Sequence, residues 1–532
     1  MATYSDTSLR SSPYSWFKGL GFQLLIVFLI ILFQYALYAF FQMPLKESYY
    51  SNSFLVLRVK EFGLKYILAF VLLFTGAVYL EFSSSKPREH VVGLSRYIYI
   101  AVVVIQTYTI AVMDYNHYFD QWYMIDRIIL VLLSILAIWR PVLLPFYILQ
   151  LVLLTSQLEF PNIIGYDSTH KSLVIPLLLC FWLFASSKKV LTYRLPSYVY
   201  TIIVISIICT WYLQAGMAKF ELNWQNDNDL YYLLAASHDA GWLYTIPTES
   251  LIALGELVTK NHIVIQYLGL IIELILPLVI FLNRRIAIVC FFAFICFHGL
   301  VFALSGIFFW QWMVIEGIII YVLVSNSAFA KQFFQLKNAV TYYFLLLLIP
   351  TFVYVIKLAW LDCGYLNAYT FFVKNAEGET KKLDTSFFAP YDVGFAKNRF
   401  TYTLDGNFIS NTLGQCRDAE VINIIKAWQS EGNEKSTAQI IDYRDQKGRK
   451  YFNVDKAQRF NYFLKEFTTN KLRYDPKFIS NVDVPLHMAQ GENQQNISFD
   501  NATELMVLYQ EKAILPNFEE YIVSSDTLRI KL

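Results

Sequence analysis

The sequence predicts an all-α polytopic membrane domain of about eleven helices, residues 1–360, followed by a small α+β extracytoplasmic domain, residues 361–532. The first observation behind this fold class is composition: the 532 residues are 56% hydrophobic and 16% charged, with a mean hydropathy of +0.42. The second is a series of long apolar runs. The third is a change at Asp362 to the composition of a soluble domain.

A membrane-spanning helix needs about 20 mostly apolar residues. Runs of this kind predict helices at 19–42, 64–81, 97–113, 128–139, 142–157, 172–187, 197–217, 263–283, 286–304, 307–324 and 341–360. Arg140 and Pro141 interrupt the region 128–157, which predicts two short helices or a re-entrant pair there. The bias of lysine and arginine between alternate loops orients the N-terminus inwards and places residues after 360 on the extracytoplasmic side.

The ends and loops of this domain give further expectations. The N-terminal segment is polar for too long to be a cleaved signal peptide, so the first apolar run is expected to be retained. The loop 218–262 contains "DLYYLLAASH" and "TESLIALGELV", which predict short amphipathic helices at the outer interface. A net charge of +2 indicates no nucleic-acid partner, whereas membrane lipid is an expected one. The expected location is the bacterial inner membrane, with the endoplasmic reticulum membrane as the alternative.

The C-terminal domain is predicted from four segments. "AYTFFVKNAEGETKKLD" and "IIDYRDQKGRKYFNV" are typical of β-hairpins, because each has a glycine-containing turn between strand-like runs. "RDAEVINIIKAWQSEG" and "DKAQRFNYFLKEFTTN" have helical apolar spacing. Cys363 and Cys416 lie in polar sequence and are candidates for one disulfide in an extracytoplasmic domain, and no cysteine spacing typical of a metal site occurs.

Ionisable side chains within or at the ends of membrane helices are costly, so they are the first candidates for function. They are His170, Lys219, Glu273 and His298. His170 and Lys219 begin and end a predicted helical hairpin, at distances from its turn that differ by about five residues, or roughly 7.5 Å of helix rise. We therefore expect both to reach one outer pocket. Glu273 and His298 lie deep in the next two helices, where each needs a buried partner, either each other or another basic group.

Each candidate also has a purely structural interpretation. Lys219 is either an anchor whose amine lies among headgroups or an amine held in a low dielectric as a base. His170 is otherwise a loop histidine beside Lys171, and His298 a core histidine bonded to a backbone carbonyl. Glu273 is otherwise a carboxylate that bridges helices.

One stretch resembles a known family. Tyr212, the pair Ala215–Gly216, Lys219 and Trp224 stand at the spacing of a motif in the vitamin K-dependent γ-glutamyl carboxylase family. The wider relatives of that family carry the horizontally transferred transmembrane (HTTM) domain. In the carboxylases the lysine of this motif is the catalytic base, so the resemblance implies that role for Lys219.

A second stretch is similar to the same family. "GLIIELILPLVIFLNRR" and "FFAFICFHGLVFALSGIFF" resemble its acidic residue in an apolar helix, basic turn and histidine, and match Glu273, Arg284, Arg285, His298 and Phe308. The family also has an Asn-His pair before the lysine helix. Here Thr169 precedes His170, and the pair Asn116–His117 lies several helices earlier.

The resemblance implies a reaction as well as a fold. Lys219 would deprotonate a reduced vitamin K or menaquinol-type quinone, and addition of oxygen would give an alkoxide that takes a proton from the γ-carbon of a peptide glutamate. Carbon dioxide would then add to the carbanion while the quinone leaves as an epoxide. His170 would assist with protons, and Tyr212, Gly216, Trp224, Glu273 and His298 would line the pocket. The implied partner is an exported or secreted peptide.

Two other functions remain open from the sequence. One is an HTTM-domain protein that matures an exported peptide without carboxylation. The other is a non-enzymatic membrane protein that binds a quinone or a lipid. A requirement for a quinone in turnover would favour the carboxylase over both alternatives.

Overall fold

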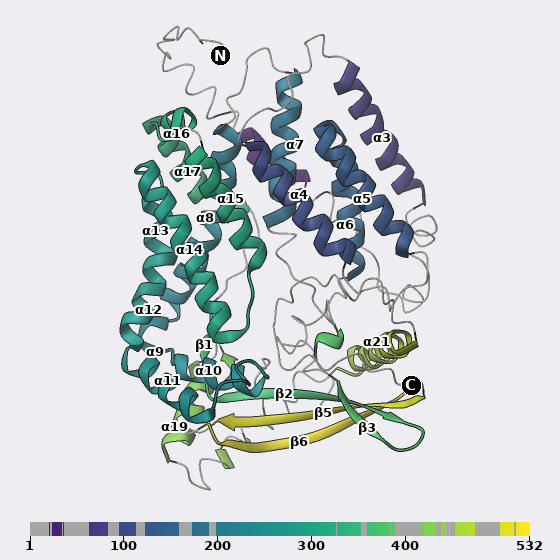
Figure 1. The fold of residues 1–532 in the computed structure, drawn as a ribbon, viewed down its shortest axis with the longest axis vertical. Coiled ribbons are helices and arrows are strands. Elements are labelled where there is room, and N and C mark those ends of the chain that lie inside the picture. Colours follow the sequence, from purple (N-terminus) through teal and green to yellow (C-terminus); the bar gives the residue numbers. More distant parts are fainter. Residues whose placement is uncertain are drawn as a thin grey trace.

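The fold is described from a computed structural model, in which helices predominate and a small antiparallel sheet lies at one end (Figure 1). The structure describes residues 21, 24–33, 36, 63–82, 95–112, 123–158, 173–190, 198–325, 327–352, 359–383, 385–388, 414–416, 419–431, 438–439, 441–442, 446, 453–473, 501–514 and 518–532. We call residues 24–352 the helical region and residues 359–532 the sheet region.

Every predicted apolar run coincides with a helix over most of its described residues, and the exceptions lie at the ends of three runs, where residues 280–283, 307–309 and 359–360 are not helical. The helices of the helical region are Leu24–Phe33, α3 Gly63–Phe82, α4 Ser95–Val112, α5 Tyr123–Trp139, α6 Leu144–Leu158, α7 Ile175–Val190, α8 Tyr198–Glu221, α12 His262–Leu270, α13 Leu276–Val279, α14 Arg284–Ser305, α15 Trp310–Ser325, α16 Ser327–Phe333 and α17 Leu336–Phe352. A π-helical segment, Ile271–Ile275, joins α12 to α13. The positions of the predicted helices are therefore confirmed.

Four of these helices are long and apolar enough to cross a membrane: Ser95–Val112, Tyr198–Glu221, His262–Val279 and Arg284–Ser305. Large apolar side chains on the last two are exposed, among them Val264 and Phe292. A helix surface of this kind is typical of contact with lipid. Among the residues that the structure describes fully, the other apolar helical stretches are shorter, at 10–17 residues, although α3 as a whole has 20 residues. The number of crossings therefore stays a prediction.

The break at Arg140 and Pro141 separates two helices, which is consistent with both expectations for this region. α5 ends at Trp139, a short 3-10 turn covers Pro141–Leu143, and α6 follows. Arg140 is extended, with φ −128° and ψ 93°, because a residue before proline is disfavoured in the helical conformation. α5 and α6 then pack against each other.

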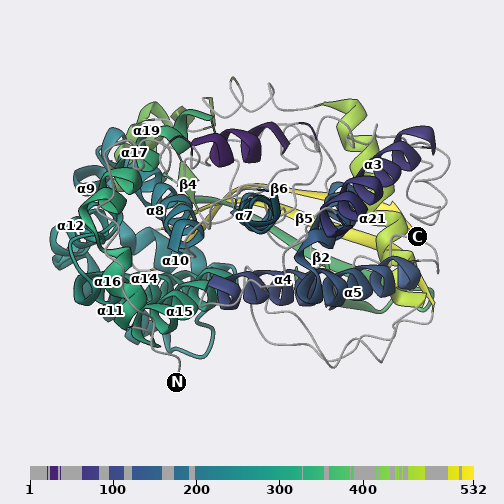
Figure 2. The same ribbon diagram turned by 90° about the horizontal axis from the view of Figure 1, so that it is seen from above.

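The helices pack around α8, the most enclosed of the four span-length helices, with 83% of its most apolar 18-residue stretch buried. Viewed along the bundle, α4 runs between α15 on one side and α5 on the other (Figure 2). The C-terminal end of α8 points towards the sheet region, and three short helices follow it: α9 Trp224–Asp227, α10 Leu230–Asp239 and α11 Thr248–Lys260. The two predicted short helices of this loop, now α10 and α11, are confirmed.

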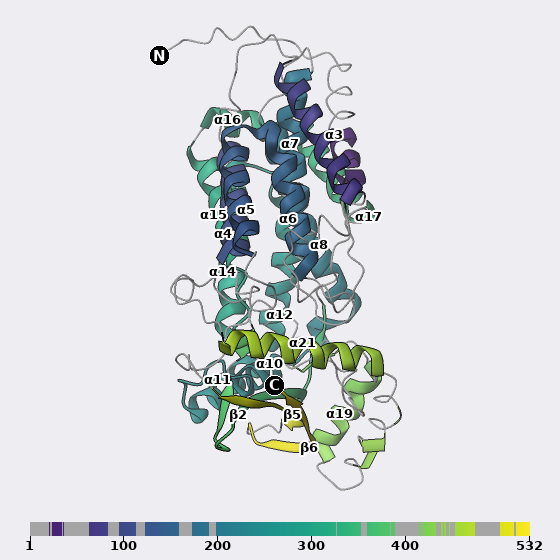
Figure 3. The same ribbon diagram turned by 90° about the vertical axis from the view of Figure 1, so that its right-hand side faces the viewer.

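The sheet region is built on four antiparallel strands in the order β3-β2-β5-β6. They are β2 Tyr365–Asn375, β3 Thr380–Leu383, β5 Ala502–Ile514 and β6 Glu520–Lys531. β2 and β3 form the first predicted hairpin, and α19 Ala419–Glu431 and α21 Val454–Arg473 are the two predicted helices. α21 lies between the strands and the helical region (Figure 3). Its Phe460, Phe463 and Phe467 share a hydrophobic core with strand β5.

The second predicted hairpin, 440–454, is wrong where the structure describes it. Ile441, Asp442 and Gln446 are helical, and the long strands that complete the sheet come from β5 and β6 instead. In β5 apolar side chains occupy both faces over Leu505–Tyr509, which obscures the period-two alternation of a strand. Pairing with β2 over eleven register positions, from Tyr365↔Ala513 to Asn375↔Ala502, decides this segment.

The predicted disulfide between Cys363 and Cys416 is also wrong, since the structure contains no bond between these two sulfur atoms. They lie on a two-stranded sheet of β1, Leu361–Asp362, and β4, Gln415–Cys416, in which Cys416 is opposite Leu361. The two cysteines are therefore diagonal neighbours, about 7–8 Å apart at Cα, and a disulfide needs less. The Cys363 thiol instead donates to the Gly414 carbonyl oxygen at 2.9 Å.

Candidate functional site

The candidate site begins on one face of the last turns of α8. Tyr212, Gly216 and Lys219 stand at positions i, i+4 and i+7, so they share a face. At Gly216 this face touches the π-helical segment: a Cβ there would lie 2.9 Å from Glu273 Cβ and 2.8 Å from Leu274 Cδ2. A residue without a side chain is thus what allows α8 to approach Glu273 so closely.

The amine of Lys219 is paired with a carboxylate. Lys219 Nζ lies 2.7 Å from Glu273 Oε1, and the side chains are 15% and 5% exposed. The amine also lies 5.1 Å from the ring centre of Trp224 and 5.6 Å from that of Phe297. The amine is therefore directed into the protein, whereas the amine of an anchoring lysine would point outwards. The partner of Glu273 is thus the basic group Lys219.

The π-helical segment has a local cause. Pro277 has no N–H group to donate to the carbonyl of Glu273, four residues earlier, so the ordinary helical bonding is interrupted there. The chain continues through one wider turn at Ile271–Ile275, which carries Glu273 at its centre. Such π-helical turns are frequent at functional sites.

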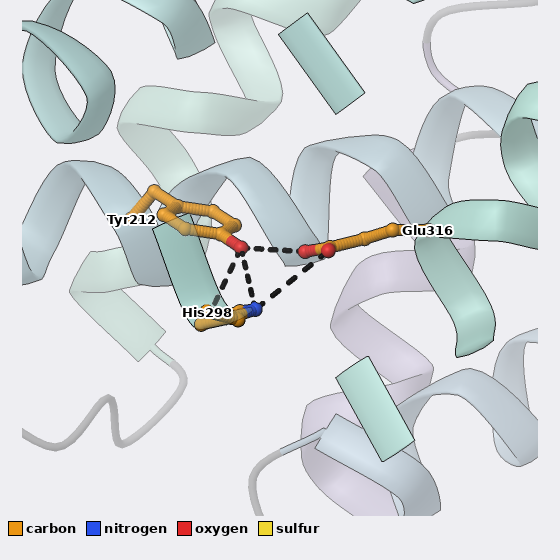
Figure 4. A network of polar contacts seen from close by, with 3 residues as sticks. All are labelled: Tyr212, His298 and Glu316. Atoms are coloured by element: carbon orange, nitrogen blue, oxygen red, sulfur yellow. Dashed lines mark hydrogen bonds and ion pairs between the residues drawn. The ribbon is translucent and has the colours of Figure 1, made fainter. Parts of the chain in front are cut away.

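A second polar cluster lies deeper in the helical region and joins Tyr212 of α8, His298 of α14 and Glu316 of α15 (Figure 4). The Tyr212 hydroxyl donates to Glu316 Oε1 at 2.5 Å and lies 3.3 Å from both ring nitrogens of His298. His298 Nδ1 is 3.7 Å from Glu316 Oε2. All three side chains are buried. We call Tyr212, His298 and Glu316 the inner cluster.

Aromatic rings enclose the inner cluster. Phe294 stacks on the Tyr212 ring with centres 3.9 Å apart, and Phe309 and Trp312 lie against His298 at 5.0 Å and 6.2 Å. The two clusters are also electrically coupled, because Glu273 lies within electrostatic range of both His298 and Tyr212. Polar groups in such surroundings interact strongly because few solvent dipoles screen them.

Sequence reasoning missed Glu316. It lies in the middle of the predicted helix 307–324, and the depth criterion that selected Glu273 and His298 selects it equally well. The structure thus brings six expected residues and one missed residue together around α8: Tyr212, Gly216, Lys219, Trp224, Glu273 and His298, with Glu316. His170, Thr169 and the pair Asn116–His117 lie outside the described residues, so the place of His170 stays a prediction.

The sheet region adds a carboxylate near Lys219 that the sequence did not indicate. Asn228, between α9 and α10, donates from Nδ2 to Asp362 Oδ2 at 3.0 Å, and its Oδ1 accepts from the backbone N–H of Asp362. Gln266 of α12 holds Asn228 by donating to its carbonyl oxygen at 2.7 Å. Burial raises the pKa of Asp362 to about 7, although Asn228 and the charge of Lys219 both lower it.

We expect the free energy of unfolding to fall as pH rises through this range. Because the folded pKa of Asp362, about 7, exceeds the ordinary value of 3.8, the folded state binds more protons between those values. The free energy of unfolding is then highest below pH 3.8 and falls as the pH rises to about 7, by about 4 kcal/mol at most. Thermal unfolding followed by tryptophan fluorescence should show this loss in the wild type and a flatter profile in Asp362→Asn. Asp227→Asn, at an exposed aspartate of α9, should keep the wild-type slope.

Gly216 gives a second prediction. In Gly216→Ala the new Cβ meets Glu273 Cβ and Leu274, so α8 and the π-helical segment must separate. We expect a loss of about 1–3 kcal/mol in stability, as for other overpacked positions. The control is Gly76→Ala in α3, where nothing lies within 4 Å and replacement should stabilise the helix slightly. Equal thermal midpoints for the two variants would contradict the close approach.

Among the described residues no group of three or more His, Cys, Asp or Glu side chains is placed to hold a metal ion. No family model, curated protein or solved structure matches the chain. Fold and site therefore define a class: a mostly helical protein whose described residues include four helices of membrane-spanning length and composition, joined to a small antiparallel sheet. Its distinguishing feature is a buried lysine–carboxylate pair beside a buried Tyr-His-Glu cluster.

Proposed function

We propose that this chain is an integral-membrane enzyme of the γ-glutamyl carboxylase type, in which Lys219 is the base that acts on a reduced quinone. The observation that carries the proposal is the enclosed contact between Lys219 Nζ and Glu273 Oε1, at 2.7 Å. An anchoring lysine has no need of a buried carboxylate, whereas a base that works on a lipid-soluble substrate needs a desolvated amine with a proton acceptor beside it.

The residues around Lys219 fit a quinol. Trp224 and Phe297 offer ring faces to an aromatic molecule, and Glu273 Oε2 is buried with no hydrogen-bond partner among the described residues. That oxygen is available to accept from a hydroxyl group. When bound, the reduced quinone would supply, through its reaction with oxygen, the strong base that carboxylation of glutamate by carbon dioxide requires.

Glu273 gives Lys219 a way to become neutral. The pair carries no net charge either as ammonium and carboxylate or as amine and carboxylic acid. Removal of water favours the second form, because a low dielectric disfavours separated charges. A proton that passes from Lys219 Nζ to Glu273 Oε1 leaves a free amine next to the place where we expect the hydroxyl.

The proposal also includes sidedness and a partner. The sheet region lies at the Lys219 end of α8, so an exported peptide that carries glutamate would approach from the sheet side (Figure 1). With the charge bias of the loops, this side is extracytoplasmic, in a bacterial inner membrane or in the endoplasmic reticulum. His170 remains the proposed second proton-handling residue.

The test uses the full chain in lipid nanodiscs. It is supplied with reduced vitamin K or menaquinol, oxygen, bicarbonate and a glutamate-rich peptide. We expect quinone epoxide by chromatography and a peptide heavier by one carboxyl group by mass spectrometry. Epoxide without a heavier peptide would favour a different maturation reaction, and the absence of both with every quinone would overturn the proposal.

A further inference from the structure

The inner cluster is electrically neutral only if one of its side chains carries an additional proton. Glu316 is completely buried, and Tyr212 donates to one of its oxygens. The other, Oε2, has no hydrogen-bond partner in the described part of the chain, and its nearest cationic group is His298 at 3.7 Å. An ionised carboxylate in such a place needs a counter-charge. Either His298 or Glu316 must therefore carry an extra proton to keep the cluster neutral.

Tyr212 connects the two possible positions of that proton. Its hydroxyl is 2.5 Å from Glu316 Oε1 and 3.3 Å from the His298 ring nitrogens. A hydroxyl both donates and accepts, so it can pass one proton while receiving another. Because the separation of 3.7 Å is too long for a direct hydrogen bond, the low dielectric favours the form without charges, Glu316 protonated and His298 neutral.

The inner cluster also lies beside the Lys219–Glu273 pair. Tyr212 stands on α8 seven residues before Lys219, and Glu273 lies within electrostatic range of His298. A proton gained by His298 therefore stabilises the Glu273 carboxylate after Lys219 has become neutral.

We propose that the inner cluster is a proton store, in which Glu316 holds a proton at rest and positions His298, through Tyr212, to accept the proton that leaves the Lys219–Glu273 pair. The transfer is balanced: Lys219 loses one proton, His298 gains one, and the total charge of the five side chains is unchanged. Glu316 is a positioning residue in this scheme. Its link to turnover rests on the proposed function, whereas the proton on Glu316 does not.

Three titratable groups of the described residues interact electrostatically with Glu316: Tyr212 and Cys209 of α8 and His298 of α14. Cys209 is buried and takes part in none of the hydrogen bonds described above for the inner cluster. Cys209→Ala is therefore a matched control.

The first measurement needs no substrate. Infrared spectra of the full chain in nanodiscs at neutral pH should contain the C=O band of a protonated carboxylic acid. In an Asp362→Asn background, which removes the other carboxyl group that is protonated near neutral pH, the Glu316 component of this band should be lost in Glu316→Gln and remain in Cys209→Ala. In Tyr212→Phe it should shift, because the carboxyl group loses a donor. A wild type that lacks the band, or a band unchanged in Glu316→Gln, would overturn the proposal.

The second measurement follows quinone oxidation as a function of pH. Glu316→Gln should lower kcat by about tenfold or more and move the acidic limb of the profile, with KM unchanged, since proton handling rather than binding is altered. Equal profiles for Glu316→Gln and wild type would overturn the link to Lys219. If the wild type oxidises no quinone, the proposed function fails while the infrared result still decides whether Glu316 stores a proton.

Discussion

Lys219→Ala is expected to reduce quinone oxidation and peptide carboxylation by about 10²–10⁴-fold, the usual contribution of a general base. The variant should still fold and insert, because Glu273, left without Lys219, can take up a proton and become neutral. Lys219→Arg should not restore turnover, since a guanidinium group stays protonated. Initial rates at saturating quinol, normalised to folded protein, test both variants.

The matched control is Lys260→Ala. Lys260 is an exposed lysine in the last turn of α11, at the same end of the helical region. Its loss should leave the rates at wild-type values. If Lys219→Arg were as active as the wild type, or Lys219→Ala lost no more activity than Lys260→Ala, Lys219 would have no role as a base.

Glu273→Leu is expected to produce the largest loss of stability, about 3–5 kcal/mol, because it leaves the Lys219 ammonium enclosed without its partner. The ammonium is only 15% exposed, so water replaces the lost contact poorly. Lys219→Met/Glu273→Leu should recover most of the loss, as exchanges of buried ion pairs for apolar pairs commonly do. Denaturation midpoints of the single and double variants measure the coupling between the two residues.

The same variants separate a structural role from a catalytic one. The double variant should be stable and inactive, whereas a purely structural pair would give a double variant that is both stable and active. Glu256→Leu, at an exposed glutamate of α11, should change stability by less than about 0.5 kcal/mol. A loss in Glu273→Leu no larger than this would show that Lys219 does not depend on Glu273.

Much of the fold could be predicted because the signals for it are local. Apolar runs mark helices, since a buried backbone must satisfy its own hydrogen bonds, and Pro141 marks the end of α5 for the same reason. The first hairpin, α19 and α21 also follow from short-range patterns. The second hairpin failed because a glycine between polar strands is a weak signal, and the sheet it was meant to join is completed from residues 502–531.

The candidate site was predicted less evenly. Depth in an apolar helix identified Glu273 and His298 and applies to Glu316 as well, because a buried ionisable group is costly wherever it lies. No sequence pattern indicated Asp362, because it is the second residue of a short strand outside the apolar helices. Its contact with Asn228, which Gln266 holds in turn, depends on tertiary structure. The place of His170 beside Lys219 stays a prediction.

By itself the sequence determined where helices form, where the sheet region begins and which ionisable residues lie deep in apolar helices, because each of these depends on neighbours within about one helix length. Only the tertiary structure decided the partners. Lys219 meets Glu273 54 residues later, Tyr212 meets Glu316 104 residues later, and Asn228 meets Asp362 134 residues later. These pairings depend on which helices pack together and on their relative shift along the helix axes. Gly216, which has no side chain, allows one such close contact, that of α8 with Glu273. Local patterns carry no record of that geometry, which arises when the helices come together.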